Sequence, residues 1–271
     1  MILSRRGQAV LAIFCSLTFG ACVPRAGTVP EAGPTTLTVF AAASLADAFE
    51  DLAVDFEATN PGLDVILNFG ASQALRTQIE EGAQADVFAS ANREEMKALV
   101  DAGLVEESGT PIFARNLLVV VLPADNPAGV KDLHDLARPG IRLIVADPAV
   151  PAGTYTRRLL DSLAGDREWG VSFRDALLAN VVSEEESVRA VLAKVALGEA
   201  DAGFVYASDA VSQPALVRLD LPAEHNPVAE YPLAALRASP HAGAASDFIG
   251  FVLSASGQQI LERHGFIPAG H

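Results

Sequence analysis

The chain has 271 residues, of which 50% are hydrophobic and 20% charged, so it can bury a full core and is not an intrinsically disordered protein. Its formal net charge of −15 at pH 7 excludes a nucleic-acid-binding protein, because such proteins need a basic face. The negative charge does not exclude an anionic ligand, because surface charges farther away than a Debye length of about 8 Å are largely screened.

The first residues predict an export signal. Arg5 and Arg6 precede an apolar stretch over 9–21, which is shorter than the ~20 residues that span a bilayer. The stretch ends in Gly20-Ala21-Cys22, and small residues before a cysteine resemble a bacterial lipoprotein cleavage site. We therefore expect residues 1–21 to be a signal peptide of lipoprotein type and Cys22 to be lipidated. Ordinary cleavage near Ala21 without a lipid is the alternative.

Cleavage at this point removes Arg5 and Arg6 and leaves 17 basic against 34 acidic residues, a net charge of −17. It also removes Cys15, so we expect no disulfide in the mature protein. Residues 22–35 are rich in proline and glycine, which predicts a flexible tether. We expect the protein in the periplasm or on the outer face of the cytoplasmic membrane, attached there if Cys22 is acylated.

From residue 37 onward, strand patterns alternate with helix patterns. Leu37–Phe40 indicates a short buried strand, and the helix after it is predicted by apolar residues spaced four, three and four apart: Leu45, Phe49, Leu52 and Phe56. The chain then predicts a strand over 63–69, a helix over 73–81, a strand over 86–89 and a helix over 93–102. This alternation indicates a parallel sheet.

A second alternating block begins with the strongest strand pattern of the chain, residues 117–122. Further strands are predicted over 143–146, 202–206, 216–219 and 228–236, and helices over 154–163, 188–197, 245–254 and 257–264. Two blocks predict two lobes, the first formed by 36–115 plus 231–271 and the second by 116–230. We expect the runs 117–122 and 228–236 to cross between the lobes, with a ligand in the cleft.

Four short motifs stand where a predicted strand meets a predicted helix: AAASL (41–45), FGASQ (69–73), DPAVPAGTY (147–155) and GFVYASDA (203–210). The backbone N–H groups at a helix start have no partner within the helix, and the helix dipole is positive there. Several such ends that converge on one point form an anion site without Lys or Arg. The motifs therefore predict an anion-binding protein.

These motifs resemble those of the substrate-binding proteins of bacterial ABC importers for molybdate. The resemblance extends over 37–266 and includes FGAS-x-x-L-x-x-QI-x-x-G-x-x-ADVF at 69–88 and SVRAVLAKVALGEADAGFVYASDA at 187–210. It implies a two-lobed type II periplasmic-binding-protein fold of the α/β class. Each lobe would be a mostly parallel sheet flanked by helices, two crossing strands would join the lobes, and a hinge motion would close them.

The resemblance also implies the ligand site. It assigns hydroxyl donors to Ser44, Ser72 and Tyr206, and main-chain N–H donors to Ala152 and Val188. The ligand would be molybdate or tungstate, which the sequence does not separate, and molybdenum would enter only as part of the bound oxyanion. The protein would be a monomer with no cofactor and no catalytic residue, and it would deliver the anion to a separate ABC permease and its ATPase.

The chemistry of the anion supports this donor set. A fully ionised molybdate only accepts hydrogen bonds, and hydroxyls and amides can donate them. Phosphate carries a proton at neutral pH and is better served by an added carboxylate acceptor, which none of the five positions supplies. The residues therefore favour molybdate, tungstate or sulfate over phosphate, and a sulfate-binding protein is the alternative.

The start of the helix near Val188 has two interpretations. Ser183 and Glu186 form a capping-box pattern, and a helix that started there would use the Val188 N–H internally. If Glu186 or Ser187 caps the helix instead, the Val188 N–H is free. The resemblance favours this second interpretation.

Four of the five residues also have a purely structural interpretation. Ser44 and Ser72 could be ordinary helix caps, Tyr206 a core tyrosine and Ala152 part of a turn. The five histidines show no metal-ligand spacing, so we expect no protein-bound metal centre.

A serine hydrolase is the remote alternative function. Residues 70–74 resemble a nucleophile elbow around Ser72, and Asp209 and His264 follow in hydrolase order. The absence of a His-Gly-Gly oxyanion loop and the early position of Ser72 argue against it.

Overall fold

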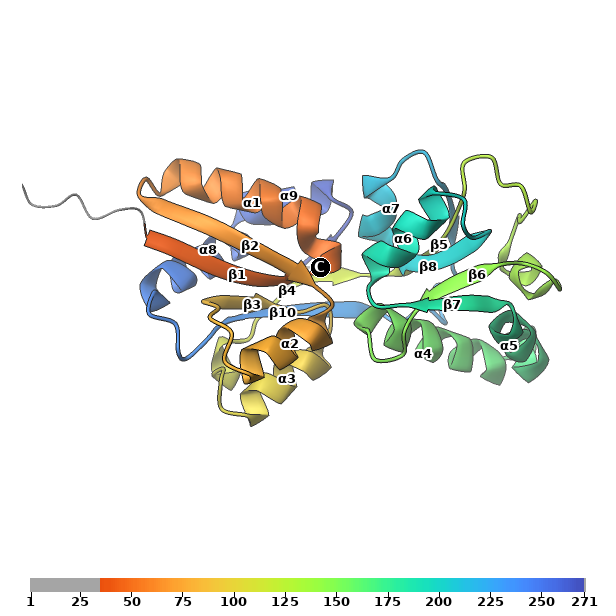
Figure 1. Cartoon of the computed structure of the whole chain (residues 1–271), viewed down its shortest axis with the longest axis horizontal. Helices are drawn as coiled ribbons and strands as arrows, with labels where there is room; N and C mark the ends of the chain where they lie inside the picture. The colour runs from red at the N-terminus through yellow and green to blue at the C-terminus, as the bar shows by residue number, and fades with distance from the viewer. Residues whose placement is uncertain (1–34, 271) are drawn as a thin grey trace, which may run out of the picture. The chain divides into compact units, whose positions relative to one another are not determined.

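The computed structural model describes residues 35–270, which form two β-sheets flanked by helices (Figure 1). The six-stranded sheet of the first lobe has the order β11-β4-β10-β3-β1-β2. Its strands are β1 Thr35–Ala42, β2 Leu63–Gly70, β3 Val87–Ala89, β4 Ile112–Asn116, β10 Ala229–Ala235 and β11 Ile267–Pro268. The five-stranded sheet of the second lobe has the order β7-β6-β8-β5-β9. Its strands are β5 Leu118–Leu122, β6 Leu143–Ala146, β7 Val181–Glu185, β8 Ala202–Tyr206 and β9 Val217–Asp220.

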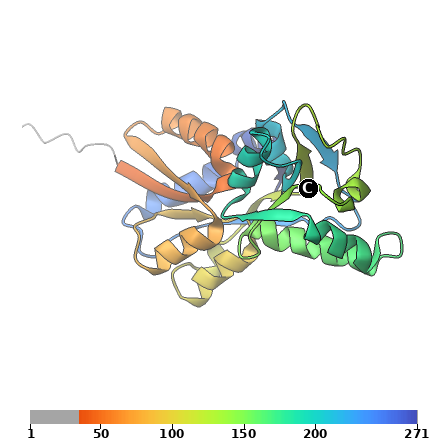
Figure 2. The ribbon, with the colours of Figure 1, turned by 45° about the vertical axis from the view of Figure 1, so that its right-hand side comes forward.

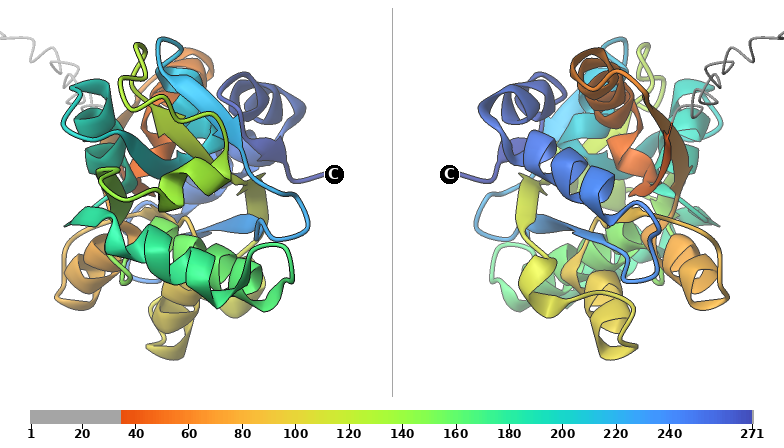
Figure 3. Two further views of the ribbon diagram at one scale, coloured as in Figure 1. Left: turned by 90° about the vertical axis from the view of Figure 1, so that its right-hand side faces the viewer. Right: turned by 90° about the vertical axis from the view of Figure 1, so that its left-hand side faces the viewer.

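Helices cover both faces of each sheet, as the end-on views in Figure 3 show. In the first lobe, one face carries α1 Ala46–Thr59, α8 Ala242–Leu253 and α9 Ala255–Arg263, and the other carries α2 Ser72–Glu80 and α3 Arg93–Asp101. In the second lobe, one face carries α6 Val188–Ala196 and α7 Ala207–Ser212, and the other carries α4 Pro151–Gly165 and α5 Gly170–Ala179. Short 3₁₀ turns complete the fold: η1 Ala43–Leu45, η2 Glu107–Gly109 and η3 Leu133–Ala137.

The helix α1 packs onto the first sheet through its regularly spaced apolar residues. Phe49 and Phe56 are fully buried, and the Phe49 ring meets the rings of Phe113 and Phe248 edge to face, with centroids 5.7 and 6.1 Å apart. Such pairs add to the gain from burying the rings. The helix predicted from this spacing is confirmed.

Both sheets contain antiparallel pairs, but most strands of each sheet run in one direction, as expected from the sequence. The strands β2, β1 and β3 run parallel, as do β7, β6 and β8. However, β10 runs antiparallel to both β3 and β4, and β5 antiparallel to both β8 and β9. The reason is topological: the parallel strands end where the lobes meet, so a strand that enters a lobe from that side must run the opposite way.

The chain passes between the sheets at two points. The predicted strand 117–122 lies in the second sheet as β5, and it follows β4 after the single residue Leu117. The return passage lies between β9 and β10. The strands β4, β7 and β11 and the helix α5 were not predicted from the sequence. Arg115 and Asn116 interrupt the apolar pattern of β4, and Glu184 and Glu185 interrupt that of β7.

The described residues all belong to one compact unit of the chain. The expected signal peptide, Cys22 and the tether up to residue 34 lie outside the described residues. Within 35–270, none of the helices has the length and apolar character needed to cross a membrane.

Gly153 permits the close approach of α4 to the end of β6. A Cβ atom at this position would lie 2.0 Å from the carbonyl oxygen of Asp147 and 2.5 Å from that of Ala146. Both distances are far below a van der Waals contact, and both neighbours are backbone atoms. Only glycine lets the first turn of α4 stand against this strand end.

We therefore expect Gly153→Ala to destabilise the protein by at least about 1–3 kcal/mol, as overpacking does, and to lower the Tm by several degrees. Gly165→Ala, at the other end of the same helix, is the matched control, because a Cβ there meets no atom within 4 Å. Thermal denaturation followed by circular dichroism measures both variants. Equal Tm values for the two would contradict this account of Gly153.

Candidate anion-binding site

The four motifs converge where the parallel strands of both sheets end. In the first lobe, Ala42 at the end of β1 pairs with Gly70 at the end of β2. In the second lobe, β6 and β8 run parallel, and the motifs that follow them begin α4 and α7. The carboxyl ends of parallel strands are where α/β proteins bind ligands. Here they line one small cavity that is shared by the two lobes.

All five residues predicted from the sequence line this cavity: Ser44, Ser72, Ala152, Val188 and Tyr206. Each of them is buried, with at most 4% of its surface exposed. The remaining lining residues are mostly small: Ala42, Ala43, Gly70, Ala71, Ala91, Val150, Pro151 and Ser187. No carboxylate, Lys, Arg or His is among the described residues that line it.

The cavity leaves only about 10 Å³ open to the centre of a water-sized sphere. That is about the space that one water molecule needs, so no ordinary organic ligand fits into the cavity as it stands. Its walls come from both lobes, and α6 lies beside the start of α1 across their junction (Figure 2). A molecule bound here would leave only after the lobes had moved apart.

Three helices begin at this cavity, namely α2 at Ser72, α4 at Pro151 and α6 at Val188. The first N–H groups of a helix have no acceptor within that helix. Ser72 and Val188 are first residues and Ala152 is a second residue, so all three N–H groups belong to this set. The positive ends of three helix dipoles therefore meet at one point, which favours an anion.

The structure decides between the two interpretations of the helix start near Val188. Ser187 is the cap of α6, and its Oγ accepts a hydrogen bond from the Ala190 N–H at 3.2 Å. Ser183 lies in β7 and its hydroxyl donates to Glu185. The capping-box interpretation with Ser183 is therefore wrong, and Val188 is the first residue of the helix.

Two hydroxyls at the cavity hold a proton that the protein does not use. The Ser72 Oγ accepts from the Ala91 N–H at 3.0 Å, so its own O–H is left to donate. The Tyr206 hydroxyl is buried and has no hydrogen-bond partner among residues 35–270. Burial raises the pKa of Tyr206 well above its ordinary value, so this hydroxyl stays protonated. An unpaired buried polar group costs about 1–3 kcal/mol of stability. An acceptor atom in the cavity would remove this cost for the Tyr206 hydroxyl.

Several neighbours of the site were not found from the sequence. The Tyr231 hydroxyl lies 3.0 Å from the Ser44 Oγ, although the two residues are 187 positions apart. Arg189 follows Val188 and pairs with Asp47 at 2.6 Å and with the buried Asp209 at 3.1 Å. The only sequence signal for Arg189 was its position next to Val188. The sequence contained no signal for Tyr231.

Two ion pairs join the lobes. Arg189 on α6 reaches Asp47 on α1, and Arg158 on α4 reaches Glu94 on α3 at 2.7 Å. In both pairs the arginine comes from the second lobe and the carboxylate from the first. These cations are neutralised by their partners, so the field at the cavity comes mainly from the helix starts and hydroxyls.

The residues of the alternative hydrolase triad are held apart by other partners. His264 hydrogen-bonds through Nε2 to Asp51 at 2.8 Å, and Asp209 pairs with Arg189. The partner of the Ser72 hydroxyl is the Ala91 N–H, and no histidine that could accept its proton is among the described residues that line the cavity. The structure therefore does not assemble Ser72, Asp209 and His264 into a triad.

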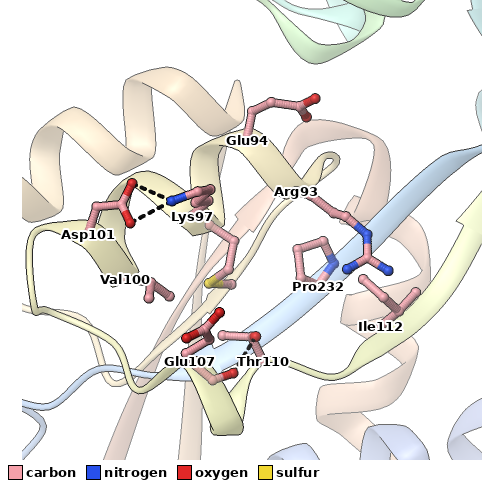
Figure 4. Close-up of a pocket in the computed structure, with 10 residues that line it drawn as sticks. Arg93, Glu94, Lys97, Val100, Asp101, Glu107, Thr110, Ile112 and Pro232 are labelled. Atoms are coloured by element: carbon pink, nitrogen blue, oxygen red, sulfur yellow. Dashed lines mark hydrogen bonds and ion pairs between the residues drawn. The ribbon is translucent and has the colours of Figure 1, made fainter.

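A larger cavity of about 460 Å³ lies on the first lobe between α3 and the strands β4 and β10 (Figure 4). None of the five predicted residues lines it. Its Lys97 is bound by both carboxylate oxygens of Asp101, at 2.6 and 2.7 Å, and Glu94 and Glu107 also border it. Because acidic groups border it and Lys97 is already paired, this cavity is poorly suited to an anion.

Comparison with known proteins places the chain in a family. The family of bacterial extracellular solute-binding proteins matches residues 37–267, and the chain belongs to it. A relative is the molybdate-binding protein ModA of Mycobacterium tuberculosis (strain ATCC 25618 / H37Rv), which is 40% identical over 91% of each chain.

Two solved structures show the same two-lobed fold. The sulfate-binding protein SubI from Mycobacterium tuberculosis H37Rv has a TM-score of 0.78 and 25% identity, with 86% of this chain and 87% of that chain covered. The periplasmic molybdate-binding protein of Azotobacter vinelandii has a TM-score of 0.74 and 24% identity, with 85% and 98% covered. The type II periplasmic-binding-protein fold expected from the sequence is confirmed.

Asp209 makes the stability of the second lobe depend on pH. Burial raises the pKa of this carboxyl to about 6, although the charge of Arg189 acts in the opposite direction. Because the folded pKa lies above the unfolded one, the contribution of Asp209 to stability is fully present below about pH 4 and is lost as the pH rises through 6.

We expect the unfolding free energy of Asp209→Asn to increase relative to that of the wild type by up to about 3 kcal/mol from pH 4 to pH 7, because only the wild type loses stability over this range. Denaturant titrations at several pH values measure this difference. Asp201→Asn is the control. Burial acts to raise the pKa of Asp201, but the hydrogen bonds and the charge of Arg142 outweigh burial and lower this pKa. The difference in unfolding free energy between Asp201→Asn and the wild type should stay constant above pH 5. A flat profile for Asp209→Asn as well would refute the assignment.

Proposed function

We propose that this protein captures molybdate, and with it tungstate, in the cavity between its lobes and delivers the anion to an ABC importer. The observation that carries this proposal is the buried Tyr206 hydroxyl, which has no hydrogen-bond partner within 35–270 and lines the same cavity as Ser44, Ser72 and three helix starts. The relative named for molybdate binding supports the choice of anion.

The donor set explains why the anion would be fully ionised. Hydrogen bonds from hydroxyls and amides to a charged group contribute roughly 1.5–3 kcal/mol each. A protonated oxyanion such as hydrogen phosphate would place its own O–H against these donors, and no carboxylate among the described lining residues could accept it. The lining therefore favours molybdate, tungstate and sulfate over phosphate.

The proposed site consists of the hydroxyls of Ser44, Ser72 and Tyr206 and the main-chain N–H groups of Ala152 and Val188. We further propose a monomer without cofactor or enzymatic activity, which works with a separate permease and ATPase. It would reside in the periplasm or on the outer face of the cytoplasmic membrane, held by a lipid on Cys22. Lobe boundaries of 36–115 plus 231–271 and 116–230 belong to the same proposal.

Sulfate is the competing ligand, because the sulfate-binding protein SubI shares the fold at 25% identity. Both anions are tetrahedral, and both present only acceptors at neutral pH. They differ in size, so the length of the donor contacts would separate them.

Ligand binding by the mature domain is tested first by thermal denaturation with molybdate, tungstate, sulfate or phosphate. A ligand at 100 times its Kd adds about 2.7 kcal/mol, which should raise the Tm by roughly 5–10 °C. We expect this shift with molybdate and tungstate and none with phosphate. A shift with sulfate alone would reassign the importer, and no shift with any of the four anions would refute an oxyanion-binding function.

Tyr206→Phe tests the site itself. We expect it to weaken molybdate binding by about 10- to 100-fold, the equivalent of one hydrogen bond to a charged group. Stability without ligand should not fall, because the removed hydroxyl has no partner among residues 35–270. Tyr155→Phe is the matched control, since its ring lies 6.4 Å from that of Tyr206 but does not line the cavity. Calorimetric titration measures both, and wild-type affinity in Tyr206→Phe would refute the site.

A further inference from the structure

Tyr231 lies directly behind the candidate site and is held rigidly. It stands on β10, the strand that returns from the second lobe, and none of its surface is exposed. Its ring makes edge-to-face contacts with Phe113, Phe266 and Tyr206, at centroid distances of 6.3, 5.4 and 5.8 Å. With three ring neighbours and no exposed surface, the side chain has little freedom to move.

The Tyr231 hydroxyl has one partner at the cavity, the Ser44 Oγ at 3.0 Å. Only one of these two hydroxyls can donate its proton in this bond. If Ser44 donated to Tyr231, the serine would have no proton left for an anion. If Tyr231 donates, the Ser44 O–H is free to point into the cavity.

Two points favour Tyr231 as the donor. A phenolic O–H is more acidic than the O–H of a serine, so it is the better donor of the two. The second serine of the site shows the same pattern without ambiguity, because the Ala91 N–H can only donate to the Ser72 Oγ. Both serine oxygens are then filled by a protein donor, and both protons are available.

We propose that Tyr231 is a positioning residue for oxyanion binding: its hydroxyl donates to the Ser44 Oγ and thereby directs the Ser44 O–H toward the ligand. Tyr231 itself does not touch the anion, since it is not among the residues that line the cavity. The inference rests on the proposed function, because it takes Ser44 as a donor to a bound oxyanion. It extends the site to a second layer that no single motif of the sequence contains.

This role predicts that Tyr231 acts only through Ser44, which a double-mutant cycle measures. The four proteins are the wild type, Ser44→Ala, Tyr231→Phe and the double variant, each titrated with molybdate and with sulfate. We expect Tyr231→Phe to weaken binding by about 3- to 10-fold, the equivalent of a neutral hydrogen bond. Ser44→Ala should weaken it by about 10-fold or more, and the double variant should bind no more weakly than Ser44→Ala.

Two results would overturn the inference. Wild-type affinity in Tyr231→Phe would show that the hydroxyl does not matter, and losses that multiply in the double variant would show that it acts independently of Ser44. Tyr155→Phe again serves as the control for removing a nearby tyrosine hydroxyl. If the wild type binds neither anion, the proposed function fails and this inference fails with it. If the wild type binds an anion and one of these two results is found, only the inference about Tyr231 fails.

Stability measurements keep the test informative if Tyr231→Phe folds poorly. In Ser44→Ala the Tyr231 hydroxyl loses its partner at the cavity, and the second substitution removes that unpaired group. We therefore expect the double variant to melt at or above the Tm of Ser44→Ala without ligand. A clearly lower Tm would mean that the hydroxyl stabilises the fold by another route, which contradicts the proposed role.

Discussion

The structure depends on one constraint: a group of hydrogen-bond donors must be held together in a buried place where the described part of the chain offers them no acceptor. Three helix starts and the Tyr206 hydroxyl meet there. Each unpaired buried donor costs free energy, and the donors repel one another electrostatically. The rest of the fold must hold them in place, and the extensive buried core of both lobes supplies the free energy to do so.

The topology of the sheets follows from this constraint. Parallel strands in both lobes end at the junction, and the helix after each strand starts there with its free N–H groups. The strands that carry the chain between the lobes run antiparallel to their neighbours, because they enter each sheet from the junction. Gly153 lets α4 begin against the end of β6, so a side chain as small as that of alanine would disturb the geometry.

The cavity is lined by uncharged residues, although the chain as a whole is strongly acidic. The chain is strongly acidic, and no Lys, Arg or His is among the described lining residues of the cavity. The arginines nearby pair with carboxylates of the opposite lobe or with buried Asp209. An unpaired cation would attract any anion, whereas donors in fixed positions select by shape and by the absence of a proton. The neutral lining and the paired arginines therefore serve the same end.

The sequence by itself determined the properties that are local in the chain. Apolar spacing predicted α1, and the four motifs contained four of the five residues that the structure brings to one cavity; the fifth, Val188, came from the family resemblance over 187–210. A free N–H at a helix start is a property of a few consecutive residues, which is why a motif can reveal it. The strands β4 and β7 were not predicted, because they contain polar residues and the prediction relied on the spacing of apolar residues.

Only the tertiary structure decided which residues stand behind the site. The contact of Tyr231 with Ser44 spans 187 positions and that of Arg189 with Asp47 spans 142. The cap at Ser187 and the mixed direction of the strands were likewise decided by how β7 and the return strands pair. Such contacts arise from the order of strands in a sheet and the packing of lobes, and no local pattern of residues encodes them.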